Sequence, residues 1–445
     1  MSQQVTTATR PARRAAAASL AGTTIEYYDF FLYGAAAALV FGPQFFPSFS
    51  PVAGALASFG VFAAGFLARP LGGLVMGHFG DRVGRKSMLV ISLLLVGLTT
   101  TAIGLLPTYE QIGVWAPIAL TTLRLLQGFG VGGEWSGAVL MSVEHAPAGR
   151  RGLFGIFPQT GVPAGLLLSN LAFLAASFAS AATFAAWAWR IPFLASIVLV
   201  VVGLVVRLRV TESPEFVEVE RKGAHSKRPL LDALRQYPGR ILVAGALPIA
   251  SIMITYVFTV YALSYLTTVL KVGQSTALLC VLVGTAVFIV GLPVAGHLCD
   301  RIGARRVFLA GSVWLLLSAA VLFPLLNTGV VGLFVVGGVL VCFGLASTYG
   351  PCAAMISELF PAHVRFSGSS LGYQLATLLG GAPAPFLAVA VYQATGTSLG
   401  VTGYMVALAA VSLVGGLMFS RVRPLGASGT SVADAGAVQR GRSSA

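Results

Sequence analysis

Five ionisable side chains lie within otherwise apolar stretches of this sequence: Glu26, Asp29, Arg69, Arg124 and Glu134. A charge at the centre of a lipid bilayer costs about 2.5–3.5 kcal/mol on insertion scales, so a chain retains one for a structural partner or for a task. Carboxylates exchange protons, and guanidinium groups bind carboxylates through charge-assisted hydrogen bonds. The chemistry that these residues suggest is proton exchange combined with recognition of a charged solute.

Asp29 and Arg124 each lie about midway along their apolar runs, and these two runs cross in opposite directions. We therefore hypothesise a gated ion pair between them. A solute that draws Arg124 away would favour protonation of Asp29, so that proton binding would follow solute binding. The alternative is a static ion pair that holds two helices together. Glu26, Asp29 and Tyr33 are spaced three and four residues apart and are predicted to share a helical face.

Arg69 and Glu134 are expected at matching depth and could pair, either as a structural bridge or as a proton relay. Glu26 could be a second proton site or a partner on the cytoplasmic side, and the sequence leaves this choice open. Polar residues on the apolar runs could line a solute path or simply bond a neighbouring helix. The candidates for the path are Tyr33, Gln127, Gln159, Tyr256, Tyr349 and Gln374.

The composition of the chain is that of a membrane protein. Hydrophobic residues make up 56% of it and charged residues 9%, whereas soluble domains carry roughly 25% charged residues. Twelve apolar runs are each long enough for a spanning helix of about 20 residues: 17–42, 54–77, 87–107, 113–142, 153–180, 184–206, 241–270, 276–298, 307–325, 329–357, 367–394 and 399–420.

Backbone groups in lipid must be bonded internally, and the alternation that a membrane barrel needs is absent. We therefore predict an all-α membrane protein with twelve transmembrane helices in two pseudo-symmetric six-helix bundles. The first run is read as a retained span and not as a signal peptide, because it carries Glu26 and Asp29 and ends without a small-residue cleavage pattern.

The net charge of +14 comes from residues near the expected ends of the spans. All of the lysines and arginines lie in the tails, the alternate loops or the central linker except Arg69, Arg124, Arg190 and Lys271. This is the positive-inside pattern, which predicts a multi-pass protein of the cell (inner) membrane with both termini in the cytoplasm, and not a nucleic-acid-binding protein.

The two halves of the chain repeat each other. Gly77-His-Phe-Gly-Asp81-Arg82-Val-Gly84-Arg85-Lys86 follows the second run, and Gly296-His-Leu-Cys-Asp300-Arg301-Ile-Gly-Ala-Arg305 follows the eighth. Likewise, Glu144 and Arg151 precede the fifth run as Glu358 and Arg365 precede the eleventh. We predict that these loop residues form a cytoplasmic latch in addition to a topology signal. Its members are Gly77, Asp81, Arg82, Gly84, Arg85, Lys86, Glu144, Arg151, Asp300, Arg301, Arg305, Glu358 and Arg365.

The predicted organisation has five parts. A cytoplasmic N-terminal tail (1–16) precedes the first bundle (17–206), a cytoplasmic linker (207–240) leads to the second bundle (241–420), and a disordered cytoplasmic tail (421–445) follows. A duplicated bundle of this kind places its solute site between the halves, near the midplane.

Several ordered motifs carry a family resemblance: Gly22-Thr-Thr-Ile-Glu26-Tyr-Tyr-Asp29, Arg69-Pro-Leu-Gly72-Gly73, Arg124-Leu-Leu-Gln127-Gly128, Gly132-Gly133-Glu134-Trp135, Trp189-Arg190-Ile-Pro192-Phe193, Glu212-Ser-Pro-Glu215-Phe216 and Leu371-Gly372-Tyr373-Gln374. With the two loops, they make the chain resemble the metabolite:proton symporters of the major facilitator superfamily. The resemblance implies alternating access and proton-driven uptake, and related symporters use an acidic residue of the first span with an arginine of the fourth.

The resemblance implies uptake of a small carboxylate-bearing metabolite, an organic acid such as citrate, 2-oxoglutarate or shikimate. A zwitterion such as proline or betaine, or an uncoupled facilitator, is the alternative. The expected partners are the solute, protons and the lipid bilayer, with no nucleic acid, and the chain is expected to act as a monomer. Neither a metal nor a cofactor is expected, because the proton gradient drives transport. The scattered histidines and cysteines form no catalytic or metal-binding pattern, so no enzyme is expected.

Overall fold

The computed structural model describes residues 2–83, 85–132, 134–147, 150–208, 229–361, 364–381 and 383–422. Within these ranges every regular element is helical. The first half contains α1 (Ser2–Leu39), α2 (Phe41–Phe45), α3 (Pro51–Val83), α4 (Arg85–Leu105), α5 (Tyr109–Ile112), α6 (Trp115–Val131), α7 (Glu134–Glu144), α8 (Arg151–Ala176), α9 (Ala181–Ala186), η1 (Ala188–Arg190) and α10 (Ile191–Leu208).

The second half repeats this helical content. It contains α12 (Pro229–Gln236), α13 (Pro238–Tyr256), η2 (Val257–Tyr261), α14 (Ala262–Thr268), α15 (Gln274–Ile302), α16 (Ala304–Leu326), α17 (Val331–Leu359), α18 (Arg365–Ala376), η4 (Thr377–Gly381), α19 (Ala384–Thr395) and α20 (Leu399–Val422).

Ten helical segments among the described residues are long and apolar enough to cross a membrane. The other two of the predicted twelve are α1, which carries Glu26 and Asp29, and the consecutive helices α6 and α7. The chain therefore has the twelve spans that the apolar runs predicted. A span of this kind buries one face in the protein and offers the rest to lipid, which is why large hydrophobic side chains such as Leu67, Val198 and Val290 are exposed.

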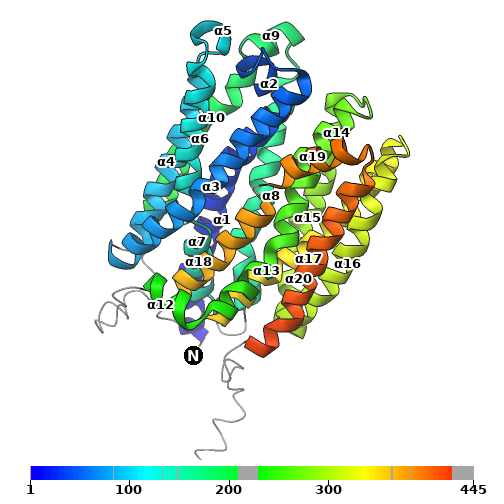
Figure 1. The fold of residues 1–445 in the computed structure, drawn as a ribbon. Coiled ribbons are helices and arrows are strands. Elements are labelled where there is room, and N and C mark those ends of the chain that lie inside the picture. Colours follow the sequence, from blue (N-terminus) through cyan, green and yellow to red (C-terminus); the bar gives the residue numbers. More distant parts are fainter. Residues whose placement is uncertain are drawn as a thin grey trace, which may run out of the picture.

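The helices form two bundles that stand side by side (Figure 1). In the first, α1 packs along α8, α10 along α4 and α3 along α6; in the second, α16 packs along α17 and α13 along α20. The halves meet where α8 lies against α15 and α17, and where α18 lies against α3 and α7. The site that a duplicated bundle is expected to form would lie along this seam.

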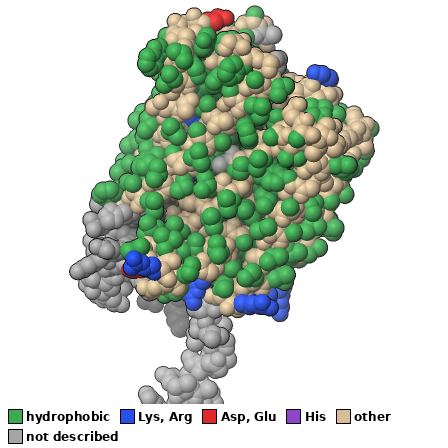
Figure 2. Space-filling view, viewed as in Figure 1, with side chains coloured by type: hydrophobic (Ala, Val, Ile, Leu, Met, Phe, Trp, Pro, Cys, Tyr) green, Lys and Arg blue, Asp and Glu red, His purple; other side chains and the backbone are tan. Residues whose placement is uncertain are grey.

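The two ends of the molecule differ. The start of α1 lies near α12 at one end, which we call the α12 end, and α5 and α9 lie at the opposite end, which we call the α5 end (Figure 1). Figure 2 shows hydrophobic side chains across the middle of the visible face and most of its Lys and Arg side chains at the α12 end. An apolar band with a basic margin is what the positive-inside pattern predicts.

Some predicted boundaries differ from the helices. Helix α1 begins at Ser2 and so runs through the segment expected to be a tail, and α10 extends to Leu208, so that Arg207 belongs to the sixth span and not to the linker. Most of the predicted linker (209–228) and of the C-terminal tail (423–445) lies outside the described residues. The assignment of Arg207 is the difference that matters for the chemistry.

Candidate functional site

A cavity lies between the two halves. It contains about 320 Å³ of space not filled by atoms. Both halves contribute to its wall, which consists of Tyr27, Phe31, Val162, Ser251, Ile252, Thr255, Tyr256, Phe288, Tyr349, Tyr373 and Thr377. Aromatic faces and hydroxyl groups therefore dominate the surface that a solute would meet.

Three tyrosine hydroxyls cross the seam as a hydrogen-bonded chain. The Tyr373 hydroxyl lies 3.1 Å from that of Tyr27 and 3.0 Å from that of Tyr349. The Tyr373 ring also stacks on Trp135 of the first half, with ring centroids 3.9 Å apart and an interplanar angle of 3°. Tyr373 thus joins α18 to both α1 and α7, and it closes one side of the cavity.

Only two of the predicted path residues, Tyr256 and Tyr349, line this cavity. The other four, Tyr33, Gln127, Gln159 and Gln374, do not line the cavity and instead contact other residues between the helices. Gln159 accepts a hydrogen bond from Trp135 Nε1 (2.7 Å) and donates one to the carbonyl of Tyr349 (2.8 Å). Gln374 donates to the carbonyl of Gly132. These amides hold the two halves together, because a buried amide must find partners wherever it lies.

Gln127 and Tyr33 lie deeper in the first bundle. Gln127 Nε2 donates to Thr100 Oγ1 (2.7 Å) and to the carbonyl of Asp29 (3.3 Å), and its Oε1 accepts from Arg124. Tyr33 is fully buried and packs against Phe41 and Phe62. Their predicted place on the cavity surface is therefore wrong for this conformation, since both point into the bundle.

Two buried guanidinium groups lie beside the cavity. The Arg69 and Arg124 side chains are 1% and 0% exposed, and their guanidinium carbons lie 4.9 Å and 4.1 Å from the centroid of the Phe30 ring. The cavity-lining tyrosines Tyr27 and Tyr256 interact electrostatically with Arg69. Arg124 likewise interacts electrostatically with Tyr256, so both arginines lie beside the cavity on its first-half side.

Neither arginine has a carboxylate partner among the described residues. Within the same part of the chain, Arg69 Nε and Nη1 and Arg124 Nε and Nη2 have no hydrogen-bond acceptor. Aromatic rings occupy the faces of both groups, including Tyr33 and Phe62 against Arg124 at 4.4 Å and 4.7 Å. Ring contacts of this kind contribute roughly 0.5–2 kcal/mol, which leaves much of the cost of burying each charge without compensation.

The predicted ion pair between Asp29 and Arg124 is not formed. Asp29 is fully buried, and its Oδ1 accepts a hydrogen bond from Ser196 on α10. Arg124 instead contacts the ring of Phe30, on the side of α1 that faces α3. The two residues share a depth but lie on different sides of α1, so Gln127 links Arg124 to the backbone of α1 instead of to the carboxylate.

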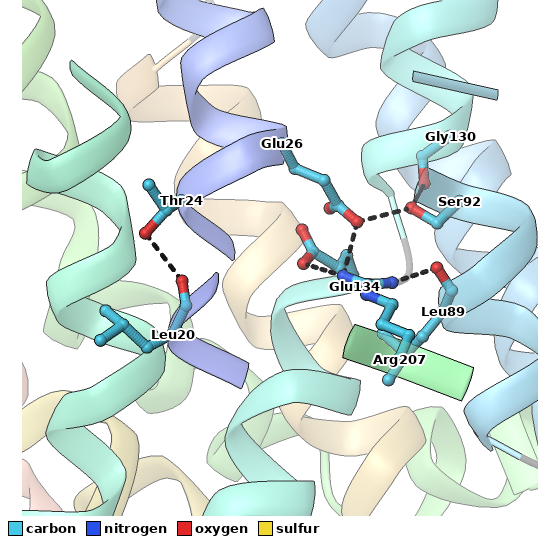
Figure 3. A network of polar contacts seen from close by, with 8 residues as sticks. All are labelled: Leu20, Thr24, Glu26, Leu89, Ser92, Gly130, Glu134 and Arg207. Atoms are coloured by element: carbon cyan, nitrogen blue, oxygen red, sulfur yellow. Dashed lines mark hydrogen bonds and ion pairs between the residues drawn. The ribbon is translucent and has the colours of Figure 1, made fainter. Parts of the chain in front are cut away.

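The predicted pairing of Arg69 with Glu134 is also wrong. Glu134 Oε1 lies 2.8 Å from Arg207 Nη2, and Glu26 Oε1 lies 2.8 Å from the same nitrogen (Figure 3). Arg207 in addition donates through Nη1 to the carbonyl of Leu89. Figure 3 shows both carboxylates pointing at this one guanidinium from α1 and α7. We call Glu26, Glu134 and Arg207 the carboxylate–arginine cluster.

Arg207 was not among the predicted site residues, because the sixth apolar run stops just before it. A signal was present: a long arginine stem can reach back into the membrane from the end of a helix while its head finds a partner. Here α10 places the head group against the acids of α1 and α7, and the Arg207 side chain is only 7% exposed. Glu26 therefore has a partner, Arg207, near the α12 end. A partner on that side was one of the two roles predicted for Glu26.

One predicted latch residue of the second half, Asp300, contacts the first half. Asp300 accepts hydrogen bonds from the backbone amides of Gly152 (2.9 Å) and Leu153 (3.1 Å), which belong to the first turn of α8 in the other half. Free amides and the helix dipole at such an end favour an anion. Asp300, in the last turn of α15, thus joins the two halves at the α12 end.

The other latch residues are distributed as follows. Lys86 donates to the carbonyl of Leu208 (2.8 Å), Arg305 to that of Gly416 (3.3 Å) and Arg365 to that of Phe360 (3.3 Å). Arg151 and Arg301 are exposed, and Glu358 is partly buried. Gly84 and the side chains at Gly77, Asp81, Arg82, Arg85 and Glu144 lie outside the described part of the chain.

The close packing of α3 against α6 depends on glycines. A Cβ atom on Gly128 would overlap the carbonyl of Gly65, and one on Gly72 would overlap the carbonyl of Phe129. Contact at this range lets two backbones approach directly, which is how small residues associate helices in lipid. The contact brings Arg69 of α3 and Arg124 of α6 to the same ring of Phe30.

Comparison with known proteins agrees with this architecture. The family profile described as "Sugar (and other) transporter" matches residues 15–240, and that of the Major Facilitator Superfamily matches residues 246–438. The solved structure of the proton:xylose symporter XylE bound to 6-bromo-6-deoxy-D-glucose superposes with a TM-score of 0.75 at 17% identity, covering 93% of this chain and 96% of that one. A structural match at this low sequence identity supports the fold only.

Relatives with higher identity are metabolite transporters. The inner membrane metabolite transport protein YhjE of Escherichia coli is 41% identical over 91% of this chain and 93% of its own length. The shikimate transporter of the same organism is 42% identical over 85% of this chain and 87% of its own. The proline/betaine transporter is 32% identical over 93% and 85%.

These relatives are transporters and not enzymes, and each aligns with this chain over most of both lengths. The twelve-helix architecture, the duplicated halves and the cavity between them fit that assignment. The chain belongs to the major facilitator superfamily, among its metabolite transporters.

Proposed function

We propose that this protein is a proton-coupled symporter that takes up a small carboxylate-bearing metabolite by alternating access. The observation that carries the proposal is the pair of buried guanidinium groups, Arg69 and Arg124, with unbonded N–H groups beside a cavity lined by hydroxyls. A carboxylate entering the cavity would supply the acceptors that these donors lack. Arginine suits this task because its planar fork binds a carboxylate through two parallel hydrogen bonds.

The tyrosine chain complements this recognition. The hydroxyls of Tyr27, Tyr349 and Tyr373 can donate to, or accept from, the hydroxyl groups of an organic acid such as shikimate. They belong to both halves, so a solute bonded to them contacts both halves at once. Binding energy of this kind can favour the state in which the cavity is closed on both sides.

Asp29 is the residue that we propose for proton coupling. Its carboxylate is fully buried, and its Oδ2 has no hydrogen-bond partner among the described residues. Gln127 links Arg124 to the backbone carbonyl of Asp29, but Arg124 does not pair with the Asp29 carboxylate in this conformation. When a solute carboxylate occupies Arg124, the proton on Asp29 would offset the added negative charge, so solute and proton would bind together.

The proposed location is the cell inner membrane, with the α12 end and both termini in the cytoplasm. The basic margin of the α12 end supports this orientation. The relative YhjE is named as an inner membrane protein. In this orientation Asp300 and its contacts with α8 close the cavity on the cytoplasmic side.

A zwitterionic solute is the second candidate. Six aromatic rings line the cavity, and ring faces bind quaternary ammonium groups; these rings belong to Tyr27, Phe31, Tyr256, Phe288, Tyr349 and Tyr373. The proline/betaine transporter among the relatives points in the same direction. The unbonded guanidinium groups favour the organic acid, because a zwitterion brings no net charge to balance them.

Uptake of radiolabelled solutes into right-side-out vesicles that contain the protein tests the proposal. The panel holds shikimate, 2-oxoglutarate, citrate, proline and betaine, each with and without an uncoupler. We expect accumulation of an organic acid that the uncoupler abolishes, and a rise in KM of roughly 10- to 100-fold in Arg124→Gln, which corresponds to losing about 1.5–3 kcal/mol of charge-assisted hydrogen bonding.

The matched control is Arg421→Gln, which removes an exposed arginine at the end of α20. It should transport as the unmodified protein does. Accumulation of betaine or proline, with an unchanged KM in Arg124→Gln, would replace the organic acid by the zwitterion. Equilibration without accumulation would replace symport by facilitated diffusion.

A further inference from the structure

The carboxylate–arginine cluster is short of one positive charge. Glu26 and Glu134 are 0% exposed and both contact the same nitrogen of Arg207, which is itself only 7% exposed. With every group ionised, two carboxylates and one guanidinium carry a net charge of −1 inside the bundle. An uncompensated buried charge is costly, and the usual remedy for a carboxylate is to bind a proton.

Each acid keeps one oxygen free for that proton. Glu26 Oε2 and Glu134 Oε2 are buried and have no hydrogen-bond partner in the part of the chain that the structure describes. The neighbouring Ser92 hydroxyl donates to the carbonyl of Gly130 (2.7 Å) and lies only at 3.5 Å from Glu26 Oε1. The local polar groups therefore leave the excess negative charge in place.

Among the described residues, the nearby ionisable groups on α1, α6 and α4 make contacts with other partners. On α1, Asp29 lies about one turn from Glu26 and is bonded to Ser196. On α6, Arg124 lies against the ring of Phe30. On α4, the partly exposed Lys86 donates to the carbonyl of Leu208 at the α12 end.

A second cavity adjoins the cluster. It contains about 380 Å³ of space not filled by atoms and is lined only by the first half: Ala15, Ala18, Ser19, Lys86, Leu89, Ala138, Met141 and Arg207. None of these residues lines the solute cavity. Lys86 is partly exposed, so this cavity connects Arg207 with the polar margin of the α12 end.

We propose that the Glu26–Glu134 pair is a proton-binding site that exchanges its proton through this second cavity, by a route that the solute does not use. One carboxylate oxygen accepts a proton from hydronium in the cavity, which leaves water and a neutral cluster; deprotonation returns the proton to water by the same path. That the cavity opens to the cytoplasm rests on the proposed function, whereas the proton site itself does not.

Infrared difference spectroscopy of the purified protein, between acidic and alkaline buffer, tests the site without transport. We expect a protonated-carboxyl C=O band at neutral pH that disappears in both Glu26→Gln and Glu134→Gln. Each substitution leaves one carboxylate against Arg207 and so removes the need for the proton. Glu110→Gln, at an exposed position of α5, should keep the band.

Two results would overturn the proton site. The first is that Glu26→Gln and Glu134→Gln both keep the same C=O band as the unmodified protein. Alternatively, the band could be missing from all of them, with a sodium-dependent spectral change in its place, which would mean that the cluster holds a sodium ion. Asp29→Asn should keep the band even where it abolishes coupled uptake. The spectrum therefore tests the proton site, and the uptake assay tests the symport proposal separately.

The route has its own test. Met141→Phe narrows the second cavity and should slow the deuterium shift of the C=O band in D2O several-fold, while solute binding stays unchanged. Met418→Phe, on an exposed position of α20, makes the same substitution away from the cavity and should leave the exchange rate as it was. Equal exchange rates in both variants would exclude this cavity as the route.

Discussion

Asp300 offers a quantitative test of the contact that joins the two halves at the α12 end. Replacing it with alanine removes both acceptors of the amides of Gly152 and Leu153. Loss of a capping side chain costs about 0.5–2 kcal/mol, and because two backbone amides lose their acceptor here we take the upper part of that range. A loss of 1–2 kcal/mol corresponds to roughly a 5- to 30-fold change in the closed-to-open ratio.

Hydrogen–deuterium exchange of peptides that contain the first turn of α8 measures this ratio directly, because the two amides exchange only when the contact opens. We expect exchange there to accelerate by the same roughly 5- to 30-fold in Asp300→Ala. Asp300→Asn keeps an oxygen acceptor without the charge and should fall between the two. Uptake should slow in Asp300→Ala although the amount of inserted protein is unchanged.

The control is Glu110→Ala, which removes an exposed acid at the α5 end. It should leave the exchange of the α8 peptides unaltered. If Asp300→Ala leaves these peptides exchanging at the original rate, the contact does not hold the halves together and the latch interpretation is wrong.

Three further predictions concern the first bundle and the seam. Arg207→Met leaves two buried carboxylates without their partner and should lower the free energy of unfolding by about 3–5 kcal/mol; adding Glu134→Gln should restore part of it in a thermal-unfolding assay, and no restoration would contradict the charge count. Gly128→Leu should prevent assembly of the first bundle, because its side chain meets the backbone of Gly65; normal yield of a monodisperse protein would contradict this. Tyr373→Phe keeps the stacked ring but leaves the hydroxyls of Tyr27 and Tyr349 without a shared partner, so the KM for solute should rise about 5- to 30-fold, for a loss of about 1–2 kcal/mol, and an unchanged KM would remove this hydroxyl from the site.

The twelve spans could be predicted because the bilayer imposes a minimum length and apolarity on every helix. The contact of Asp300 with the other half could be anticipated because the repeated motif marks it as a latch residue, although Asp300 belongs to the last turn of α15 and not to a loop. In both cases a local rule decides the outcome without knowledge of how the helices are rotated.

Ion pairing could not be predicted in the same way. Depth along a span follows from counting residues, and it placed Asp29 with Arg124, and Arg69 with Glu134. The direction in which a side chain leaves its helix depends on the rotation and packing of that helix, and the structure turns Asp29 toward α10 and Arg124 toward α3. Glu134 pairs with Arg207 because α10 extends beyond its apolar run.

The cavity shows the same limit. Tyr27 stands in the sequence only as part of a motif, yet it lines the cavity and joins the hydroxyl chain with Tyr373. Gln159 and Gln374 are predicted for the path because they are polar residues on apolar runs. Their amides instead bond backbone carbonyls across the seam, which a sequence cannot reveal before the helices are placed.

The central claim is that solute and proton cross together, with Asp29 carrying the proton. Purified protein in proteoliposomes with an internal pH indicator, supplied with the organic acid found by the uptake panel, tests it most directly. We expect acidification of the interior that is simultaneous with solute entry and lost in Asp29→Asn. Solute entry without a pH change, or the same pH change in Asp29→Asn, would contradict it.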